Sequence, residues 1–253
     1  MTKVKKPTVL LVHGLRGDRH GLRWIGEQLS GDFEVLNIDL PGSGENPELE
    51  KQDLDGYIEW MHEYIGSLKR KPIVVAHSMG AIIASHYIEK YPETVDEKVV
   101  LLAPILRGVG GKAANRAFSG VVRGAVLPFT PKRRKKIMAS KPVSWAISHY
   151  LTSDKTKQKI IDEEHYKYSG RFASAKSLSA DIKISALYET KMPRDKRVLV
   201  VFGKKDRLSS YKLARERAKQ AGAEYHEIET AGHLINYERP EEVAKRIKEF
   251  LSD

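Results

Sequence analysis

Three side chains of the types used in nucleophilic catalysis each follow a predicted strand: Ser78, Asp206 and His233. A serine hydroxyl becomes an effective nucleophile when a histidine accepts its proton and a carboxylate orients that histidine. Active sites of open α/β sheets lie at the carboxyl ends of the strands, so we expect the three side chains to converge there. The sequence therefore predicts a nucleophile (Ser78), an acid (Asp206) and a base (His233).

The candidate nucleophile lies in a segment that joins a predicted strand to a predicted helix, Ala76-His77-Ser78-Met79-Gly80. A nucleophile elbow is a sharp turn of this kind, and it needs small residues two positions before and two after the serine. Gly80 meets this requirement, whereas Ala76 replaces the usual glycine and adds one methyl group. Taken alone, the segment is equally compatible with a serine that caps the following helix.

The candidate acid and base decide between these interpretations. Asp206 follows the apolar run 198–202 and the turn residue Gly203, and His233 follows the next predicted strand in the same way. A lone aspartate after a strand is usually a turn or cap residue, and a lone histidine is usually a surface group. The order serine, aspartate, histidine is the one that α/β hydrolases use, so the combination favours a catalytic triad.

A fourth segment, His13-Gly14-Leu15-Arg16, directly follows the first predicted strand. Attack on a carbonyl carbon places negative charge on the carbonyl oxygen, and two backbone N–H groups can stabilise that charge. We expect these groups to belong to Leu15 and Met79, because Gly14 allows close approach of the backbone. A plain turn at the end of the strand is the alternative. Further candidates for contact with a substrate are Gly14, Arg16 and His77.

The elements that must position these residues alternate along the chain. Apolar runs without polar alternation predict strands that are buried on both faces, and the segment 53–68 carries the apolar stripe of a helix. The predicted fold class is α/β, with a mostly parallel sheet flanked by helices. We expect strands at 8–12, 33–38, 73–76, 98–103, 197–202 and 224–229, and helices at 22–29, 53–68, 79–89, 209–220 and 240–251.

The alternation stops after residue 104 and resumes at residue 192. We therefore predict a core domain made of residues 1–104 and 192–253, with a helical insertion at 105–191 that we call the insert. The insert carries 18 lysines and arginines against 6 aspartates and glutamates, whereas the remainder carries 26 against 27. The net charge of +11 thus arises from one internal segment.

Together these motifs resemble the α/β-hydrolase superfamily, in its branch of capped esterases, monoacylglycerol lipases and carbon–carbon bond hydrolases. The resemblance implies that the insert is a cap or lid over the active site, and that no metal or cofactor is needed. Relatives that use an aspartate nucleophile are disfavoured because residue 78 is serine. The matching segments are His13-Gly14, Asp39-Leu-Pro-Gly-Ser-Gly44, Ala76-His-Ser-Met-Gly80, Gly203-Lys-Lys-Asp206 and Ala231-Gly-His233.

The expected activity is hydrolysis of a carboxylic ester, with a small-acyl or lipid-like substrate, through an acyl-enzyme on Ser78. A carbon–carbon bond hydrolase or a thioesterase would use the same triad and is the alternative within enzymes. The non-enzyme alternative is a basic module that binds a membrane or a nucleic acid. Nucleic acid is disfavoured because no known motif is present and few aromatics lie near the basic run.

The basic insert has three interpretations. It is a solvated helical face, or it attracts an anionic membrane through Lys132-Arg-Arg-Lys-Lys136, or one of its arginines or Arg16 recognises an acidic substrate. No apolar run approaches the ~20 residues of a membrane-spanning helix. The chain has no cysteine, which excludes disulfides and a thiolate nucleophile and fits a cytoplasmic location.

Overall fold

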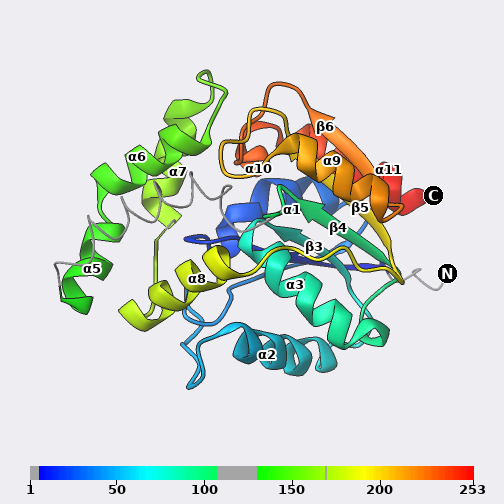
Figure 1. Ribbon diagram of the computed structural model, residues 1–253, viewed down its shortest axis with the longest axis horizontal. Helices are drawn as coiled ribbons and strands as arrows, with labels where there is room; N and C mark the ends of the chain where they lie inside the picture. Colours follow the sequence, from blue (N-terminus) through cyan, green and yellow to red (C-terminus); the bar gives the residue numbers. More distant parts are fainter. Residues whose placement is uncertain (1–5, 107–129, 169) are drawn as a thin grey trace.

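The computed structural model describes residues 6–106, 130–168 and 170–253 (Figure 1). Its centre is a six-stranded sheet in the order β2-β1-β3-β4-β5-β6, in which all neighbouring strands are parallel. The strands are β1 (Thr8–Val12), β2 (Glu34–Ile38), β3 (Ile73–His77), β4 (Lys98–Leu102), β5 (Arg197–Gly203) and β6 (Glu224–Ile228).

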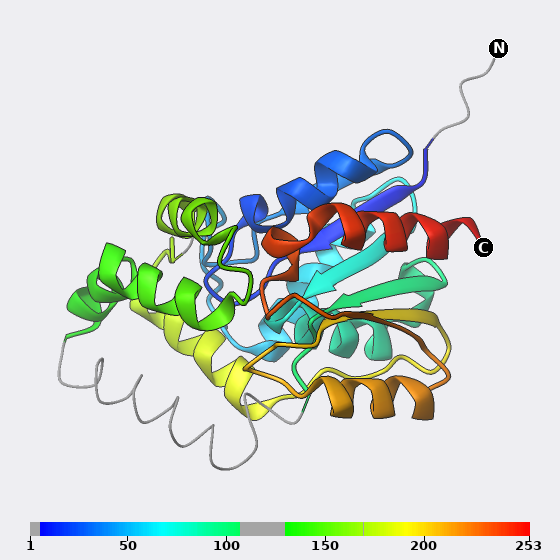
Figure 2. The same ribbon diagram turned by 90° about the horizontal axis from the view of Figure 1, so that it is seen from above.

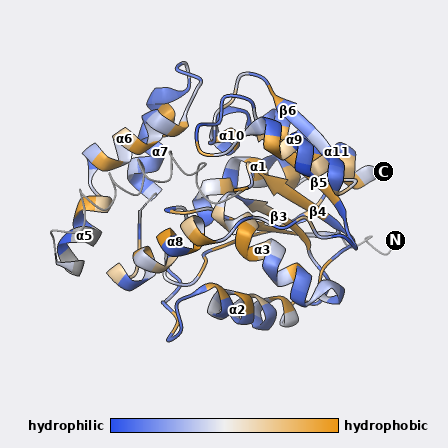
Figure 3. Cartoon of the chain, in the orientation of Figure 1, coloured by the Kyte–Doolittle hydropathy of each residue, from blue (hydrophilic) through white to orange (hydrophobic). Residues whose placement is uncertain are grey.

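Helices cover both faces of this sheet, so its strands bury side chains on both sides. On β1, Leu10 and Val12 pack with the helices α2 and α3, whereas Val9 and Leu11 pack with α1 and α11. Figure 2 shows α1 and α11 on one side of the sheet and α9 on the other. In Figure 3 the strands β3 and β4 are coloured as hydrophobic, and the covering helices carry both colours. The helices of the core are α1 (Arg23–Leu29), α2 (Leu54–Gly66), α3 (Met79–Lys90), α9 (Tyr211–Gln220), α10 (Ile235–Glu238) and α11 (Pro240–Ser252), with 3-10 turns at Arg19–Leu22 and Pro92–Thr94.

The predicted fold class is confirmed, and the expected elements of the core are present. Their ends differ from the expected ones by at most two residues, and the starts of two helices are explained by their caps. Asp53 precedes α2 and accepts a hydrogen bond from the N–H of Gly56, and Ser210 caps α9 by accepting one from Leu213. The short helix α10 after His233 was not expected from the sequence.

The described part of the insert forms helices that lie beyond the carboxyl ends of the strands (Figure 1). Residues 107–129, which the sequence analysis assigns to the insert, lie outside the described residues. Among the described residues, no helix is long and apolar enough to cross a membrane. These helices are therefore on the side of the sheet where the candidate catalytic residues were expected. They are α5 (Pro131–Met138), α6 (Lys141–Leu151), α7 (Gln158–Tyr168) and α8 (Ala175–Leu187).

The glycine-rich segment after β2 contacts the insert through its backbone. The N–H of Gly44 donates to the carbonyl of Arg171 (3.0 Å), and the N–H of Ala173 donates to the carbonyl of Gly42 (2.8 Å). Gly42 has a φ of 80°, and a Cβ there would lie 2.3 Å from the Oγ of Ser177. Position 42 therefore needs glycine both for its conformation and for the close approach of α8.

A buried carboxyl group on α8 fixes the insert to the core at a second place. The hydroxyl of Tyr57 on α2 donates to the Oδ1 of Asp181 (2.6 Å), and Asp181 is 1% exposed. The Oδ2 atom of Asp181 has no hydrogen-bond partner among the described residues. Burial raises the pKa of Asp181 to about 7, although the bond from Tyr57 acts in the opposite direction.

Because the folded state binds this proton more tightly, Asp181 should make the free energy of unfolding depend on pH. Its stabilising contribution is present below the ordinary pKa of an aspartate and is lost as the pH rises towards 7. We expect Asp181→Asn to remove this dependence. Between acidic and neutral pH, the free energy of unfolding of the variant should therefore rise by a few kcal/mol relative to that of the wild type. Urea unfolding at a series of pH values measures the difference.

The matched control is Asp55→Asn, which changes an exposed aspartate on the same helix as Tyr57. It should leave the pH dependence of the wild type in place. Parallel curves for the wild type and Asp181→Asn would contradict the assignment of the dependence to the buried carboxyl group.

Candidate active site

The three residues expected to form the triad lie together in a chain of hydrogen bonds. The Nε2 atom of His233 lies 2.9 Å from the Oγ of Ser78, and its Nδ1 atom lies 2.7 Å from the Oδ2 of Asp206. All three are buried, with the side chains of His233 and Asp206 exposed by 3% and 0%. Residues that are far apart in the sequence thus meet beyond the ends of β3, β5 and β6.

Ser78 has the backbone geometry of a nucleophile elbow. Its φ is 55° and its ψ is −119°, which is a strained conformation for a residue with a Cβ. The turn brings the first residues of α3 against the end of β1, where a Cβ on Gly80 would lie 2.4 Å from the carbonyl oxygen of His13. Position 80 therefore excludes any larger residue, whereas the methyl group of Ala76 fits within the buried strand β3.

Asp206 is held by the loop that follows it. Its Oδ1 atom accepts hydrogen bonds from the N–H groups of Leu208 (2.6 Å) and Ser209 (3.1 Å), which leaves Oδ2 for His233. Bonds to two backbone groups stabilise a charged carboxylate in a buried place and fix its orientation. The carboxylate can therefore hold the imidazole with a proton on Nδ1 and leave Nε2 to accept a proton from Ser78.

His77 supports the base from the core side. Its Nε2 atom lies 3.2 Å from the backbone carbonyl of His233, and burial lowers the pKa of His77 to about 3. A neutral imidazole with its hydrogen on Nε2 donates to that carbonyl. The structure therefore places His77, a candidate for contact with a substrate, against the backbone of the candidate base.

Of the two residues expected to form the oxyanion hole, Met79 directly follows the serine in the chain, and Leu15 follows Gly14, which approaches the serine. Met79 is the first residue of α3, and the first N–H groups of a helix have no partner within it. Gly14 brings the loop after β1 against the nucleophile, because a Cβ there would lie 2.9 Å from the Cβ of Ser78. Leu15 follows in the same loop, and an oxyanion site between Leu15 and Met79 stays a prediction.

Arg16 joins the same loop to the insert. Its side chain donates to the carbonyl of Met138 (2.5 Å) and to the Oγ of Ser144 (3.1 Å), and its carbonyl accepts from the N–H of Gly170 (2.7 Å). The residue is 5% exposed, and burial lowers its pKa to about 10, so it stays charged at neutral pH. These three hydrogen bonds of Arg16 are thus with the insert.

One buried acidic residue near the base, Glu238 on α10, could not be recognised from the sequence. It is 0% exposed, and its carboxylate accepts hydrogen bonds from three backbone N–H groups, those of Ser153, Asp154 and Gly232. In the sequence it is one glutamate in a short amphipathic segment. Its only distinguishing feature is its position five residues after His233.

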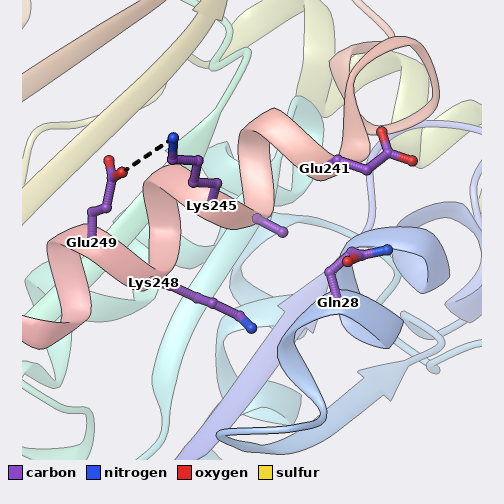
Figure 4. A pocket seen from close by; sticks show the side chains of 6 residues that line it. Gln28, Glu241, Lys245, Lys248 and Glu249 are labelled. Atoms are coloured by element: carbon purple, nitrogen blue, oxygen red, sulfur yellow. Dashed lines mark ion pairs between the residues drawn. The ribbon is translucent and has the colours of Figure 1, made fainter.

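A shallow hollow on the surface lies between α1 and α11 (Figure 4). Charged side chains surround it, and Lys245 forms an ion pair with Glu249 (4.0 Å). None of the candidate catalytic residues belongs to this hollow. Its lining residues are Gln28, Glu241, Ala244, Lys245, Lys248 and Glu249.

A parallel α/β sheet with a serine at a strained strand-to-helix turn, followed by an aspartate and a histidine at later strand ends, defines a class of hydrolases. The family model described as "Alpha/beta hydrolase family" matches residues 9–246. The chain therefore belongs to the α/β-hydrolase family.

Named relatives and solved structures agree with this family. The chain is 23% identical to the bovine monoacylglycerol lipase ABHD6 over 265 residues, which is 98% of this chain and 76% of the relative. It is similar in fold to an esterase from Exiguobacterium antarcticum (TM-score 0.76, 15% identity, 98% and 93% of the two chains). It is also similar to the enol-lactonase from Burkholderia xenovorans LB400 (TM-score 0.75, 17% identity, 100% and 94%).

Proposed function

We propose that this protein hydrolyses carboxylic esters, with Ser78 as the nucleophile, His233 as the base and Asp206 as the acid. The observation that carries the proposal is the unbroken chain of hydrogen bonds from Asp206 through His233 to Ser78. It ends on a serine with a strained backbone at the start of a helix. The names of the relatives, a monoacylglycerol lipase and an esterase among them, support an ester as the substrate class.

In the first half of the reaction, the Oγ of Ser78 attacks the ester carbonyl carbon while Nε2 of His233 takes the hydroxyl proton. Asp206 stabilises the imidazolium that forms. The negative charge on the former carbonyl oxygen is stabilised by the N–H groups of Leu15 and Met79. The intermediate collapses when His233 gives its proton to the leaving alcohol, which leaves the acyl group on Ser78.

In the second half, His233 takes a proton from a water molecule, which attacks the acyl-enzyme at the same carbonyl carbon. The same two N–H groups stabilise the second tetrahedral intermediate. His233 then returns the proton to the Oγ of Ser78, and the carboxylic acid leaves. Each step uses groups that the chain itself provides.

Replacement of the nucleophile tests this proposal. Ser78→Ala should reduce kcat for p-nitrophenyl acetate and butyrate by about 10⁴-fold or more, because acylation cannot begin without the hydroxyl. The thermal unfolding midpoint measures whether the fold is kept. The matched control Ser67→Ala removes an exposed serine hydroxyl at the end of α2 and should leave kcat unchanged. Wild-type rates in Ser78→Ala would contradict the assignment.

A panel of substrates distinguishes the ester from the alternatives that share the triad. Esters and thioesters with varied acyl chains, together with a vinylogous diketone for carbon–carbon cleavage, should give the highest kcat/KM on an oxygen ester. Arg16 and residues of the insert should affect the preference among substrates, because these residues join the oxyanion loop to the insert. A preference for the diketone would replace the ester as the proposed substrate.

We further propose that residues 105–191 act as a cap domain on a core made of 1–104 and 192–253. The support is that α5 and α6 contact Arg16 in the loop after β1, and that Asp181 on α8 contacts Tyr57 on α2. In addition, Arg171, between α7 and α8, contacts Gly44 in the segment after β2. Lids of this kind exclude water and shape the pocket for the substrate. The cytoplasmic location and the absence of nucleic-acid binding stay predictions from the sequence.

Contact between the cap and an anionic membrane is part of this proposal. Helices α6 and α7 expose three large apolar side chains, Trp145 (57%), Tyr166 (49%) and Ile160 (44%). Lysines lie among them, and the Nζ of Lys141 lies 4.4 Å from the ring of Tyr166. Exposed aromatic and aliphatic side chains among lysines are the pattern of surfaces that bind the headgroup region of anionic bilayers.

Vesicle flotation tests the membrane contact. The wild type should float with vesicles of phosphatidylcholine and phosphatidylserine but not with vesicles of phosphatidylcholine alone. Reversal of two charges, Lys141→Glu with Lys159→Glu, should reduce binding by at least about tenfold, because each surface lysine contributes about 1 kcal/mol. The control Lys219→Glu, on the exposed side of α9, should bind as the wild type does. Equal flotation with both vesicle types would contradict the contact.

A further inference from the structure

The connection between α6 and α7 belongs to the insert and contacts the core. We call residues 151–154, the last residue of α6 and the three that follow it, the strap loop. The N–H of His233 donates to the carbonyl of Leu151 in this loop (3.0 Å). The carbonyl of His233 accepts from the Nε2 of His77 (3.2 Å). The backbone of the base is thus held by the insert on one side and by β3 on the other.

The contact between the strap loop and the loop that carries the base is a close one. A Cβ on Gly232 would lie 2.4 Å from the carbonyl oxygen of Leu151 and 3.1 Å from the backbone nitrogen of Ser153. Only glycine fits such a distance to backbone atoms. The two loops are therefore in direct backbone contact, and a shift of the strap loop would move His233 or break its hydrogen bond.

One carboxylate joins these two loops. The Oε1 atom of Glu238 accepts from the N–H of Gly232 (2.9 Å), and its Oε2 atom accepts from the N–H groups of Ser153 (2.9 Å) and Asp154 (2.7 Å). The side chain is 0% exposed. Hydrogen bonds to a charged acceptor are stronger than those between neutral groups. The three bonds offset part of the cost of burying the carboxylate, although burial still raises the pKa of Glu238 above its usual value.

A second contact fixes the strap loop from the outside. The Nη1 atom of Arg239 forms an ion pair with the Oδ2 of Asp154 (2.5 Å) and donates to the carbonyl of Glu238 (2.7 Å). The side chains of Asp154 and Arg239 are mostly buried, with exposures of 12% and 27%. Glu238 and Arg239 are consecutive residues, so the end of α10 holds the strap loop at two points.

We propose that Glu238 is a positioning residue for His233. Its carboxylate fixes the strap loop against Gly232, and the strap loop in turn holds the N–H of His233. The proposal rests on the proposed function, in which His233 is the base. In this proposal, part of the insert helps to position the base, in addition to covering the candidate active site. The effect should appear in the chemical step, since small errors in the placement of a base reduce the rate strongly.

The substitution Glu238→Gln tests the proposal with little change in volume. The substitution replaces one oxygen of the carboxylate, a hydrogen-bond acceptor, with an NH2 group, which is a donor. The backbone N–H groups that this oxygen accepted from are then left without a partner. We expect kcat for p-nitrophenyl butyrate to fall by about 10- to 100-fold while KM stays within about twofold. The rate constant for labelling of Ser78 by a fluorophosphonate should fall with kcat, because labelling needs the same base but not the substrate pocket.

The matched control is Glu241→Gln, which changes an exposed glutamate three residues further on, in the first turn of α11. Its kcat and its labelling rate should equal those of the wild type. All rates are referred to the amount of folded protein, measured by near-ultraviolet circular dichroism, so that a loss of stability alone does not reduce them.

A milder variant keeps the test decisive if Glu238→Gln does not fold. Asp154→Ala removes the outer ion pair of the strap loop and leaves the backbone bonds to Glu238 in place. It should lower kcat several-fold without raising KM. Unchanged kcat per folded molecule in both variants, or a rise in KM with unchanged kcat, would overturn the proposal. Failure of the proposed function gives a different result, since Ser78→Ala would then remain active.

Discussion

Ser78 is held at the carboxyl end of β3 in a left-handed conformation that costs a residue with a Cβ about 1–3 kcal/mol. The surrounding structure makes this conformation unavoidable. The strand is paired on both sides, with β1 and β4, and α3 begins at the next residue. Gly80 allows α3 to approach the carbonyl of His13 without a clash. The hydroxyl that would attack a substrate is therefore fixed by the centre of the sheet rather than by a flexible loop.

Whereas Ser78 is held by the sheet and the helix that follows it, His233 is held by groups from several parts of the chain. Its side chain is held by Asp206, its carbonyl by His77 and its N–H by Leu151 of the insert. The insert is fixed in turn by buried polar groups of the core, of which Arg16, Tyr57 and Glu238 are examples. The insert and the candidate catalytic site are thus joined by one network of hydrogen bonds.

The sequence allowed prediction of the sheet, of its helices and of the three residues that now lie together, because each of these has a local signal. The central strands are apolar runs, and Ser78 and Asp206 each follow one, whereas His233 follows the edge strand β6, whose residues are mixed. Asp181 and Glu238 have no such signal, since their burial depends on partners elsewhere in the chain, and Tyr57 is 124 residues from Asp181. For the same reason the sequence indicated Arg16 and His77 as residues near the site, but it could not indicate what they contact.

The claim that Ser78 is the nucleophile can be tested most directly by labelling with a fluorophosphonate, followed by peptide mass spectrometry. Phosphonylation needs a serine that a neighbouring base activates. We expect one label for each molecule, on the peptide that contains Ser78, and a loss of esterase activity in proportion to the label. Label on another residue, or full activity in protein labelled at Ser78, would contradict the claim.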